Sequence, residues 1–212
     1  PIVTWADPEN GLMFRGGAIE LGNNAGWSLA TALAHIPNVY PPEEVPAKTG
    51  LVFGHFASLK ERLWALPAAA QPYLVETGMP DVGVARAFED RTTTEHSRVV
   101  GRYDEINVPS LNIGGWFDIF QQGTLDNYNA MRTRGVATRL IMGPWMHSST
   151  IPQVSGGEVG EVNFGPMALM PGGEAMSKIH FDWYDHWLKG GPATSSHESG
   201  VLIFVMGANE WR

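Results

Sequence analysis

Apolar and polar residues in the second half of the chain follow a strand, helix, strand order. Residues 106–115 form a mostly apolar run that ends in two glycines, which predicts a buried strand and a turn. A helix is predicted from Ile119 to about Arg134, where Gly135 supplies a stop, and residues 138–143 form a second short apolar strand. Together these segments predict one βαβ unit whose two strands run in the same direction.

The first half of the chain is predicted to be largely helical. Residues 1 to about 15 lack periodicity and predict a loop, and an imperfect apolar stripe predicts a helix over residues 18–35. Prolines between residues 37 and 46 then break the pattern. A second helix is predicted from about Phe53 to Ala65, and a short third one over residues 82–88. This irregular helical region has the character of a lid.

The last part of the chain alternates irregular and regular segments. Residues 148–173 are rich in Gly, Pro and Ser and predict a long surface loop. The clearest helical spacing runs from Glu174 to Lys189 and ends at two glycines and a proline. A polar linker over residues 194–200 leads to the apolar run Val201–Met206, which predicts a strand. Because few residues follow this strand, we expect its partners to lie outside the sequence.

Two polar residues follow the two strands of the predicted βαβ unit. Asp118 comes after the first strand and His147 after the second, 29 positions later. Parallel strands bring their carboxyl ends to one edge of a sheet and lie about 5 Å apart, so the two side chains are within reach of each other. A carboxylate that accepts the Nδ1 proton of histidine prepares the imidazole for proton transfer at Nε2. The spacing therefore permits an acid-base pair.

Both residues also have an ordinary structural explanation. Asp118 and Gln121 form the pattern of a helix capping box, and His147 lies in a Gly-Pro-Trp-Met-His turn, where a histidine is often a loop residue without function. Spacing alone leaves capping and catalysis open. His180 and His186 share one predicted helix, but their separation of six positions puts them on different faces, which argues against a metal pair.

A serine nucleophile is missing from the pattern. In α/β-hydrolases the triad follows the order serine, acid, histidine, so the serine should precede Asp118. Ser28 lacks the second glycine of a nucleophile elbow and lies within a predicted helix. Ser58 has no glycines beside it, and Ser97 has no strand before it. None of the three fits the strand, turn, helix context that this nucleophile requires.

Composition narrows the classes of partner. The net charge of -8 and the isoelectric point near 5.3 disfavour nucleic acid and anionic surfaces, which attract clustered lysine and arginine. The chain has no cysteine, so it forms neither disulfides nor thiolate metal sites. Its apolar runs are far shorter than the roughly 20 residues of a membrane-spanning helix. We expect no nucleic-acid partner and no membrane span, and a cytoplasmic location is favoured although no feature fixes it.

Several motifs together resemble those of a known family. Val108–Leu111 followed by Gly114–Asp118 is similar to an acid motif, and Gly143–His147 is similar to a base motif. The family is that of the cocaine-esterase-like and X-Pro dipeptidyl-peptidase-like serine hydrolases, known as CocE/NonD hydrolases. Segments further along the chain also resemble this family, namely residues 163–165, 182–190 and 204–212.

The resemblance implies an α/β fold: the C-terminal part of an α/β-hydrolase core with a helical cap insertion, ending at the first strand of a jelly-roll domain. Residues 1–103 are expected to form the cap region with a preceding core linker. Residues 104–192 are expected to form the last part of the core. Residues 193–212 are expected to form a linker and the first strand of the β-rich domain.

The resemblance also implies a chemistry. Acyl esters, amides or short peptides would be hydrolysed through an acyl-enzyme, with His147 as proton shuttle and Asp118 as its orienter, and no metal or organic cofactor is implied. Trp116, Phe117 and Trp145 flank the acid and base, so they are candidates for an apolar pocket wall. Packing under the sheet edge explains these three aromatic residues at least as well.

The elbow serine and the oxyanion donors of the family have no matching positions in the sequence. We therefore expect a fragment that needs the remainder of the hydrolase polypeptide and is inactive alone. The competing hypothesis is a non-catalytic module that binds a ligand or a partner, in which Asp118 only caps a helix.

Overall fold

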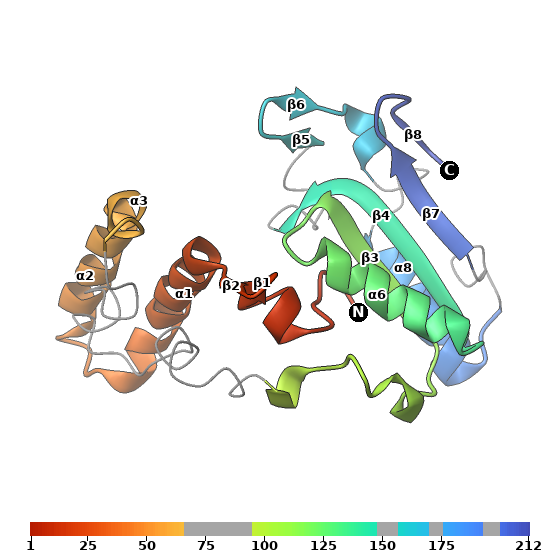
Figure 1. The fold of residues 1–212 in the computed structure, drawn as a ribbon, viewed down its shortest axis with the longest axis horizontal. Coiled ribbons are helices and arrows are strands. Elements are labelled where there is room, and N and C mark those ends of the chain that lie inside the picture. The colour runs from red at the N-terminus through yellow and green to blue at the C-terminus, as the bar shows by residue number, and fades with distance from the viewer. Residues whose placement is uncertain (66–94, 148–156, 170–175, 193–199) are drawn as a thin grey trace. The chain divides into compact units, whose positions relative to one another are not determined.

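The computed structural model describes residues 1–65, 95–147, 157–169, 176–192 and 200–212 of the chain. The chain forms two compact units (Figure 1). The α/β unit comprises Pro1–Asp7 and Arg98–Arg212, and the helical unit comprises Pro8–Ser97. In sequence, the helical unit is therefore an insertion between two segments of the α/β unit.

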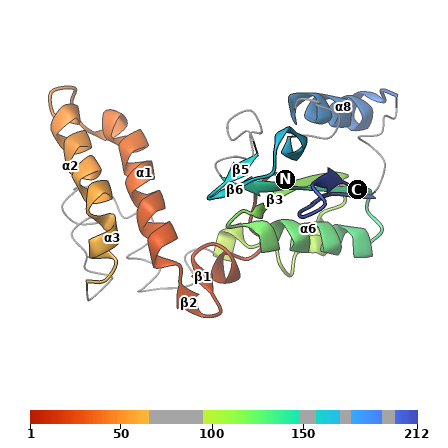
Figure 2. The ribbon, with the colours of Figure 1, turned by 90° about the horizontal axis from the view of Figure 1, so that it is seen from above.

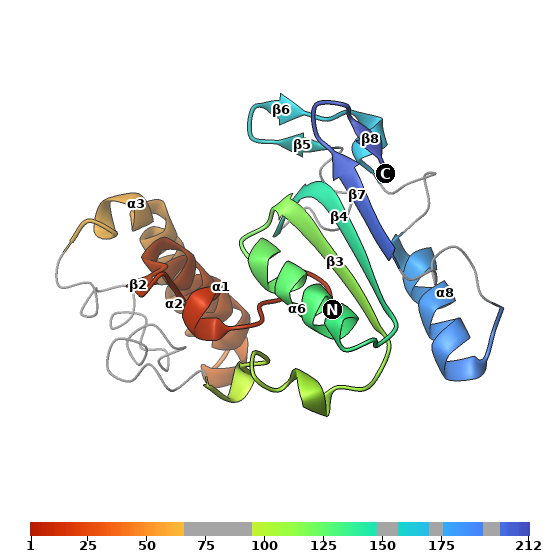
Figure 3. The ribbon, with the colours of Figure 1, turned by 45° about the vertical axis from the view of Figure 1, so that its right-hand side comes forward.

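A single sheet forms the centre of the α/β unit. Its strand order is β3 (Ser110–Phe117), β4 (Thr138–Met146), β7 (Gly200–Val205) and β8 (Glu210–Trp211). The first three strands are parallel, and β8 turns back antiparallel to β7 (Figure 3). The parallel pairing of β3 with β4 confirms the predicted βαβ unit.

The start of the chain also belongs to this sheet. Ile2 forms a parallel bridge with Ile113 of β3, and the Val3 N–H donates to the Ile113 carbonyl at 2.9 Å. The sequence predicts a loop here, because a stretch this short shows no periodicity. Its place in the α/β unit also shows that the expected cap region, residues 1–103, begins with residues of the core sheet.

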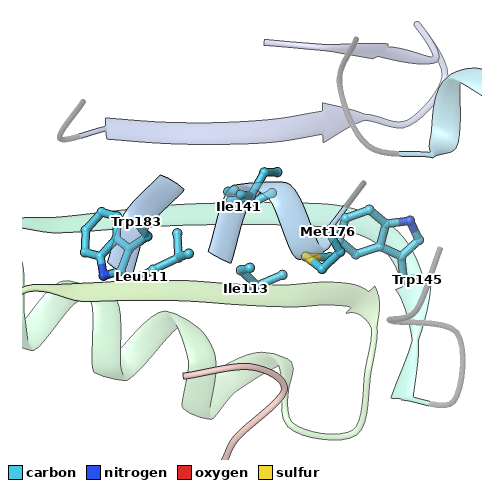
Figure 4. Close-up of a cluster of buried hydrophobic side chains, with 7 residues drawn as sticks. Leu111, Ile113, Ile141, Trp145, Met176 and Trp183 are labelled. Carbon is cyan, nitrogen blue, oxygen red and sulfur yellow. The ribbon is translucent and has the colours of Figure 1, made fainter. Parts of the chain in front are cut away.

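Two helices cover opposite faces of the sheet, α6 (Gln121–Thr133) on one side and α8 (Met176–Lys189) on the other (Figure 2). Successive strand side chains point to opposite faces, so each helix packs on its own apolar cluster. The α8 cluster, shown in Figure 4, consists of Leu111, Ile113, Ile141, Trp145, Met176, Ile179 and Trp183. The α6 cluster is built from Tyr128, Leu140 and Met142. Full burial of each large apolar side chain contributes roughly 1.5–3 kcal/mol.

Element boundaries differ from the predicted ones by a few residues. β3 begins at Ser110 rather than near residue 106, because Pro109 cannot donate to a strand neighbour, and residues 103–105 form the short helix η4 (Tyr103–Glu105). β4 continues to Met146, past Pro144. Pairing between β3 and β4 shifts register at this point, and such an irregularity tolerates proline.

The strand near the end of the chain lies in the core sheet. The sequence assigns Val201–Met206 to a following β-rich domain, with its partners outside the chain. In the structure, β7 pairs in parallel with residues Arg139–Met142 of β4. Phe204 of β7 is 1% exposed and packs with Phe164 and Ala168 of the same unit. Pairing partners separated by about 60 positions leave no local signal in sequence, which explains the difference.

The helical unit contains the longest helix of the described residues. Its elements are η1 (Pro8–Asn10), the hairpin β1 (Phe14–Arg15) and β2 (Ala18–Ile19), and the helices α1 (Leu21–Val39), α2 (Val45–Ala57) and α3 (Leu59–Arg62). α1 and α2 lie side by side (Figures 1 and 2), and their shared cluster consists of Ala25, Leu29, Ala32, Ile36 and Val52.

The limits of α1 and α2 differ from the predicted ones at positions close to prolines. α1 continues through Pro37 to Val39, beyond the predicted end at residue 35, because the fully buried Ile36 packs in the cluster shared with α2. α2 begins at Val45 rather than Phe53, since Pro46 lies in its first turn, where the missing N–H costs nothing.

Short elements complete the α/β unit. They are the hairpin β5 (Glu158–Val159) and β6 (Val162–Asn163), and the short helix η6 (Pro166–Ala168). The predicted helix over residues 82–88 lies outside the described residues. Most of the predicted linker at residues 194–200, and part of the predicted loop at 148–173, also lie outside them.

Candidate active site

Asp118 and His147 meet at the carboxyl ends of β3 and β4. The Nδ1 atom of His147 lies 3.1 Å from Oδ2 of Asp118 and 3.4 Å from Oδ1. The Asp118 side chain is completely buried, whereas the His147 side chain is 39% exposed. A buried carboxylate therefore faces one ring nitrogen of a histidine that solvent reaches.

The second oxygen of Asp118 is bound to the backbone. Oδ1 accepts a hydrogen bond from the Phe120 N–H at 2.6 Å, and the Asp118 carbonyl accepts from the Gln121 N–H at 3.1 Å. The N-cap of α6 is Phe120, which no side chain caps. Asp118 thus fixes the turn before the helix, and the predicted capping box with Gln121 is not what starts α6.

The strands approach closely just before these two residues. Gly115 lies opposite Gly143, and the next pair in register is Phe117 with Met146, so β4 contains one extra residue at this irregularity. A Cβ atom on Gly115 would overlap the backbone carbonyl of Trp145. Only glycine allows this approach, which sets the distance between the ends of β3 and β4.

Two aromatic residues that the sequence does not single out lie beside the pair. The ring of Phe120 meets the His147 imidazole edge to face, with centroids 5.0 Å apart and an interplanar angle of 89°. The ring of Trp5 meets Phe120 in turn, at 5.3 Å and 68°. A phenylalanine two positions after the acid is the one local signal for the first contact. Nothing in the sequence indicates the second.

The three aromatic residues proposed as pocket walls lie in different environments. Trp145 is 1% exposed within the α8 cluster, and its indole N–H donates to the Ala168 carbonyl at 2.8 Å. Trp116 packs against the α6 cluster and donates to the Phe204 carbonyl at 2.9 Å. Phe117 is 44% exposed, with its ring 5.9 Å from that of Phe164. Packing accounts for both tryptophans, and Phe117 is the one of the three that faces solvent.

The serines considered in the sequence lie in the helical unit. Ser28 is buried in α1, and Ser58 is the C-cap of α2, where its hydroxyl donates to the Gly54 carbonyl at 3.0 Å. Ser97 ends the helical unit, in a short helical turn. Ser28 and Ser58 therefore do not follow a strand in the way that a nucleophile elbow requires.

The two histidines of α8, His180 and His186, contact the protein rather than each other. His186 contacts the Gly191 carbonyl through Nδ1 at 2.9 Å, and burial lowers the pKa of His180.

Within the described ranges, no three His, Cys, Asp or Glu side chains are grouped so that they could hold a metal ion. Among those same ranges, no helix has the length and apolar character needed to cross a membrane.

Comparison with known proteins identifies the family of the chain. The family model of the X-Pro dipeptidyl-peptidase (S15 family) matches residues 1–149, which include both Asp118 and His147. The chain belongs to this family. The chain is therefore a member of a serine hydrolase family, as its motifs predict.

A curated relative agrees with this assignment. The chain is 32% identical over 111 residues to the cocaine esterase of Rhodococcus sp. (strain MB1 Bresler). The match covers 52% of this chain and 18% of the esterase, so the chain spans only a small part of the length of that relative.

Proposed function

We propose that Asp118 and His147 are the acid and the base of a Ser-His-Asp triad that hydrolyses acyl esters or amides. The serine and the oxyanion donors come from a region of the hydrolase outside these 212 residues. The observation that carries the proposal is the 3.1 Å contact between His147 Nδ1 and the buried Asp118 carboxylate. A buried carboxylate in this position holds the imidazole in the tautomer that leaves Nε2 as the base.

The chemistry follows from the roles of the two side chains. His147 Nε2 takes the proton of the serine hydroxyl as the serine oxygen attacks the substrate carbonyl, and the Asp118 carboxylate stabilises the imidazolium that results. The proton then passes to the leaving alcohol or amine, and an acyl-enzyme remains. Water attacks this ester while His147 takes a proton from it. The acyl–oxygen bond then breaks, His147 gives the proton to the serine oxygen, and the carboxylic acid is released.

The alternative of Asp118 as a purely structural residue explains only half of its contacts. The Oδ1 bond to the Phe120 N–H fixes the turn before α6, whereas the contact of Oδ2 with His147 adds nothing to that turn. The arrangement supports one carboxylate that does both. A rigid turn also keeps the carboxylate in place while the imidazole changes its charge.

Substrate selection is proposed to involve two further parts of the chain. Phe117 is the exposed aromatic next to the acid, so it is the candidate for an apolar pocket wall, and the helical unit is the candidate cap. Trp116 and Trp145 are proposed to support the strand ends by packing. A β-rich domain after the core stays a prediction of the family resemblance.

The test uses the intact hydrolase polypeptide that carries this sequence, with a fluorophosphonate probe. We expect stoichiometric labelling of one serine outside residues 1–212, and no labelling of the 212-residue chain alone. Asp118→Asn should slow hydrolysis of p-nitrophenyl butyrate by about 10⁴-fold, because the imidazole loses its orienting carboxylate. His147→Ala should slow it by about 10⁶-fold, because the base itself is removed.

Matched substitutions serve as controls. Asp182→Asn and His186→Gln make similar changes on α8, and each should leave the rate within about twofold of the parent. Labelling of a serine inside the 212 residues would contradict the proposal, as would full activity of the Asp118→Asn and His147→Ala variants.

A further inference from the structure

Phe120 contacts both members of the proposed acid-base pair. Its backbone N–H donates to Asp118 Oδ1 at 2.6 Å, and its ring lies edge to face with the His147 imidazole at 5.0 Å. The Phe120 side chain is almost fully buried, at 7% exposure. The orientation of the His147 ring therefore depends on where the Phe120 ring is held.

Trp5 holds the Phe120 ring from the other side. The two rings meet at 5.3 Å and 68°, which is the edge-to-face arrangement that aromatic pairs favour. Trp5, Phe120 and His147 thus form a continuous stack of three rings, which we call the ring stack. Trp5 lies 115 positions before Phe120 in sequence, so the ring stack joins the first segment of the α/β unit to its second.

Helix α6 fixes the backbone of Trp5. A Cβ atom on Gly123 would lie 2.6 Å from the Trp5 Cα, so glycine at this position lets the chain pass directly against the helix. The Asn127 side-chain amide donates to the Trp5 carbonyl at 3.4 Å, and Asn127 Oδ1 accepts from the Tyr103 hydroxyl at 2.8 Å. The backbone of Trp5 is therefore held against the helix that follows the turn fixed by Asp118.

We propose that Trp5 is a positioning residue for the reaction described above: it holds Phe120, and Phe120 holds the His147 imidazole toward Asp118. The inference rests on the proposed function. Trp5 itself needs no contact with the reacting atoms, because its effect passes through the Phe120 ring.

The size of the effect follows from the ring contacts. An edge-to-face aromatic pair contributes about 0.5–1.5 kcal/mol beyond its buried area, which corresponds to about 2- to 12-fold in a rate that depends on it. His147 transfers protons in both the formation and the breakdown of the acyl-enzyme. A misplaced imidazole therefore lowers kcat whichever of the two steps limits the reaction, while KM changes little.

The experiment measures kcat and KM for p-nitrophenyl butyrate on variants of the intact hydrolase. Trp5→Leu should lower kcat about 3- to 10-fold with KM within about twofold, and Trp5→Phe, which retains a ring, should recover most of the loss. In a Phe120→Leu background, Trp5→Leu should cause no further loss, because the intermediate ring is already absent. This non-additivity separates a residue that acts through Phe120 from one that only stabilises the fold.

Trp187→Leu is the matched control, because Trp187 makes comparable ring contacts with Trp183 and His186 on α8. It should lower the melting temperature without lowering kcat. An unchanged kcat in Trp5→Leu, or equal losses in the parent and Phe120→Leu backgrounds, would overturn the proposal for Trp5. Failure of the triad itself has a different signature, since His147→Ala would then retain full activity.

Discussion

The two oxygens of Asp118 show how one side chain takes two roles. One oxygen accepts a backbone N–H in the turn before α6, and the other faces the imidazole of His147. Because the carboxylate is completely buried, each contact replaces hydration that the group loses on folding. The contact that fixes the turn before α6 and the proposed catalytic role are therefore compatible at this residue.

The hydrogen bond from the Tyr103 hydroxyl to Asn127 predicts how the stability of the α/β unit changes with pH. Burial, together with the nearby Asp126 carboxylate, raises the pKa of Tyr103 to about 12, above the ordinary tyrosine value of 10.0. The neutral hydroxyl that donates to Asn127 therefore contributes stability that is fully present below pH 10 and is lost as the pH rises toward 12. We expect the parent to lose more stability than Tyr103→Phe over this interval.

Urea unfolding at pH 9, 10, 11 and 12 gives the measurement. The advantage of the parent over Tyr103→Phe should be about 1 kcal/mol at pH 9, the usual contribution of one hydrogen bond, and should shrink above pH 10. A difference that stays constant across the series would contradict the raised pKa.

At the scale of elements, close backbone approach sets the site. β3 and β4 meet at Gly115 and Gly143, and the register irregularity after them leads directly to Asp118 and His147. The segment that follows β4 is anchored by indole donors: Trp145 binds the Ala168 carbonyl, and Trp211 binds the Met167 carbonyl at 2.8 Å. Close packing of neighbouring backbone segments therefore sets where Asp118 and His147 lie.

Gly115→Ala tests the close approach. The new Cβ would overlap the Trp145 backbone, so the strands must separate, and we expect a loss of roughly 1–3 kcal/mol in the free energy of unfolding. Gly200→Ala in β7 is the control, because a Cβ there meets nothing within 4 Å. Urea unfolding of both variants makes the comparison. Equal stability of the two would show that strand spacing at Gly115 is not critical.

At the scale of the whole molecule, the helical unit is an insertion whose two ends meet in the α/β unit. The chain leaves this unit after Asp7 and returns at Arg98, and these two residues form an ion pair at 3.3 Å. The N–H groups of Val99 and Val100 both donate to the Ala6 carbonyl. The entry and exit points are thus fixed by contacts within the α/β unit.

This arrangement predicts that the insertion is dispensable for the fold of the α/β unit. Replacing residues 8–97 by a short Gly-Ser linker in the intact hydrolase should leave a cooperatively folded protein that still reacts with a fluorophosphonate. Its preference among p-nitrophenyl esters of different acyl length should change, since the cap is proposed to select substrates. An unchanged ester preference would contradict the role of the cap, and loss of cooperative folding would contradict the independence of the units.

The sequence alone determines those features that depend on local patterns. Apolar runs and glycine stops predict β3, α6 and β4, and their order places Asp118 and His147 at one sheet edge. The motifs around these residues predict the hydrolase family. Local chemistry suffices here because strand pairing across a single helix leaves little freedom in the chain path.

Only the tertiary structure decides which distant segments meet. It pairs Ile2 and β7 with the core sheet, places Trp145 in the apolar core, and brings Trp5 against Phe120 beside His147. These contacts join residues many positions apart, and they arise from burial and packing, which have no period or motif in the sequence. The proximity of Asp118 and His147 was predictable from their strands, whereas the ring contacts of Phe120 with His147 and Trp5 were not.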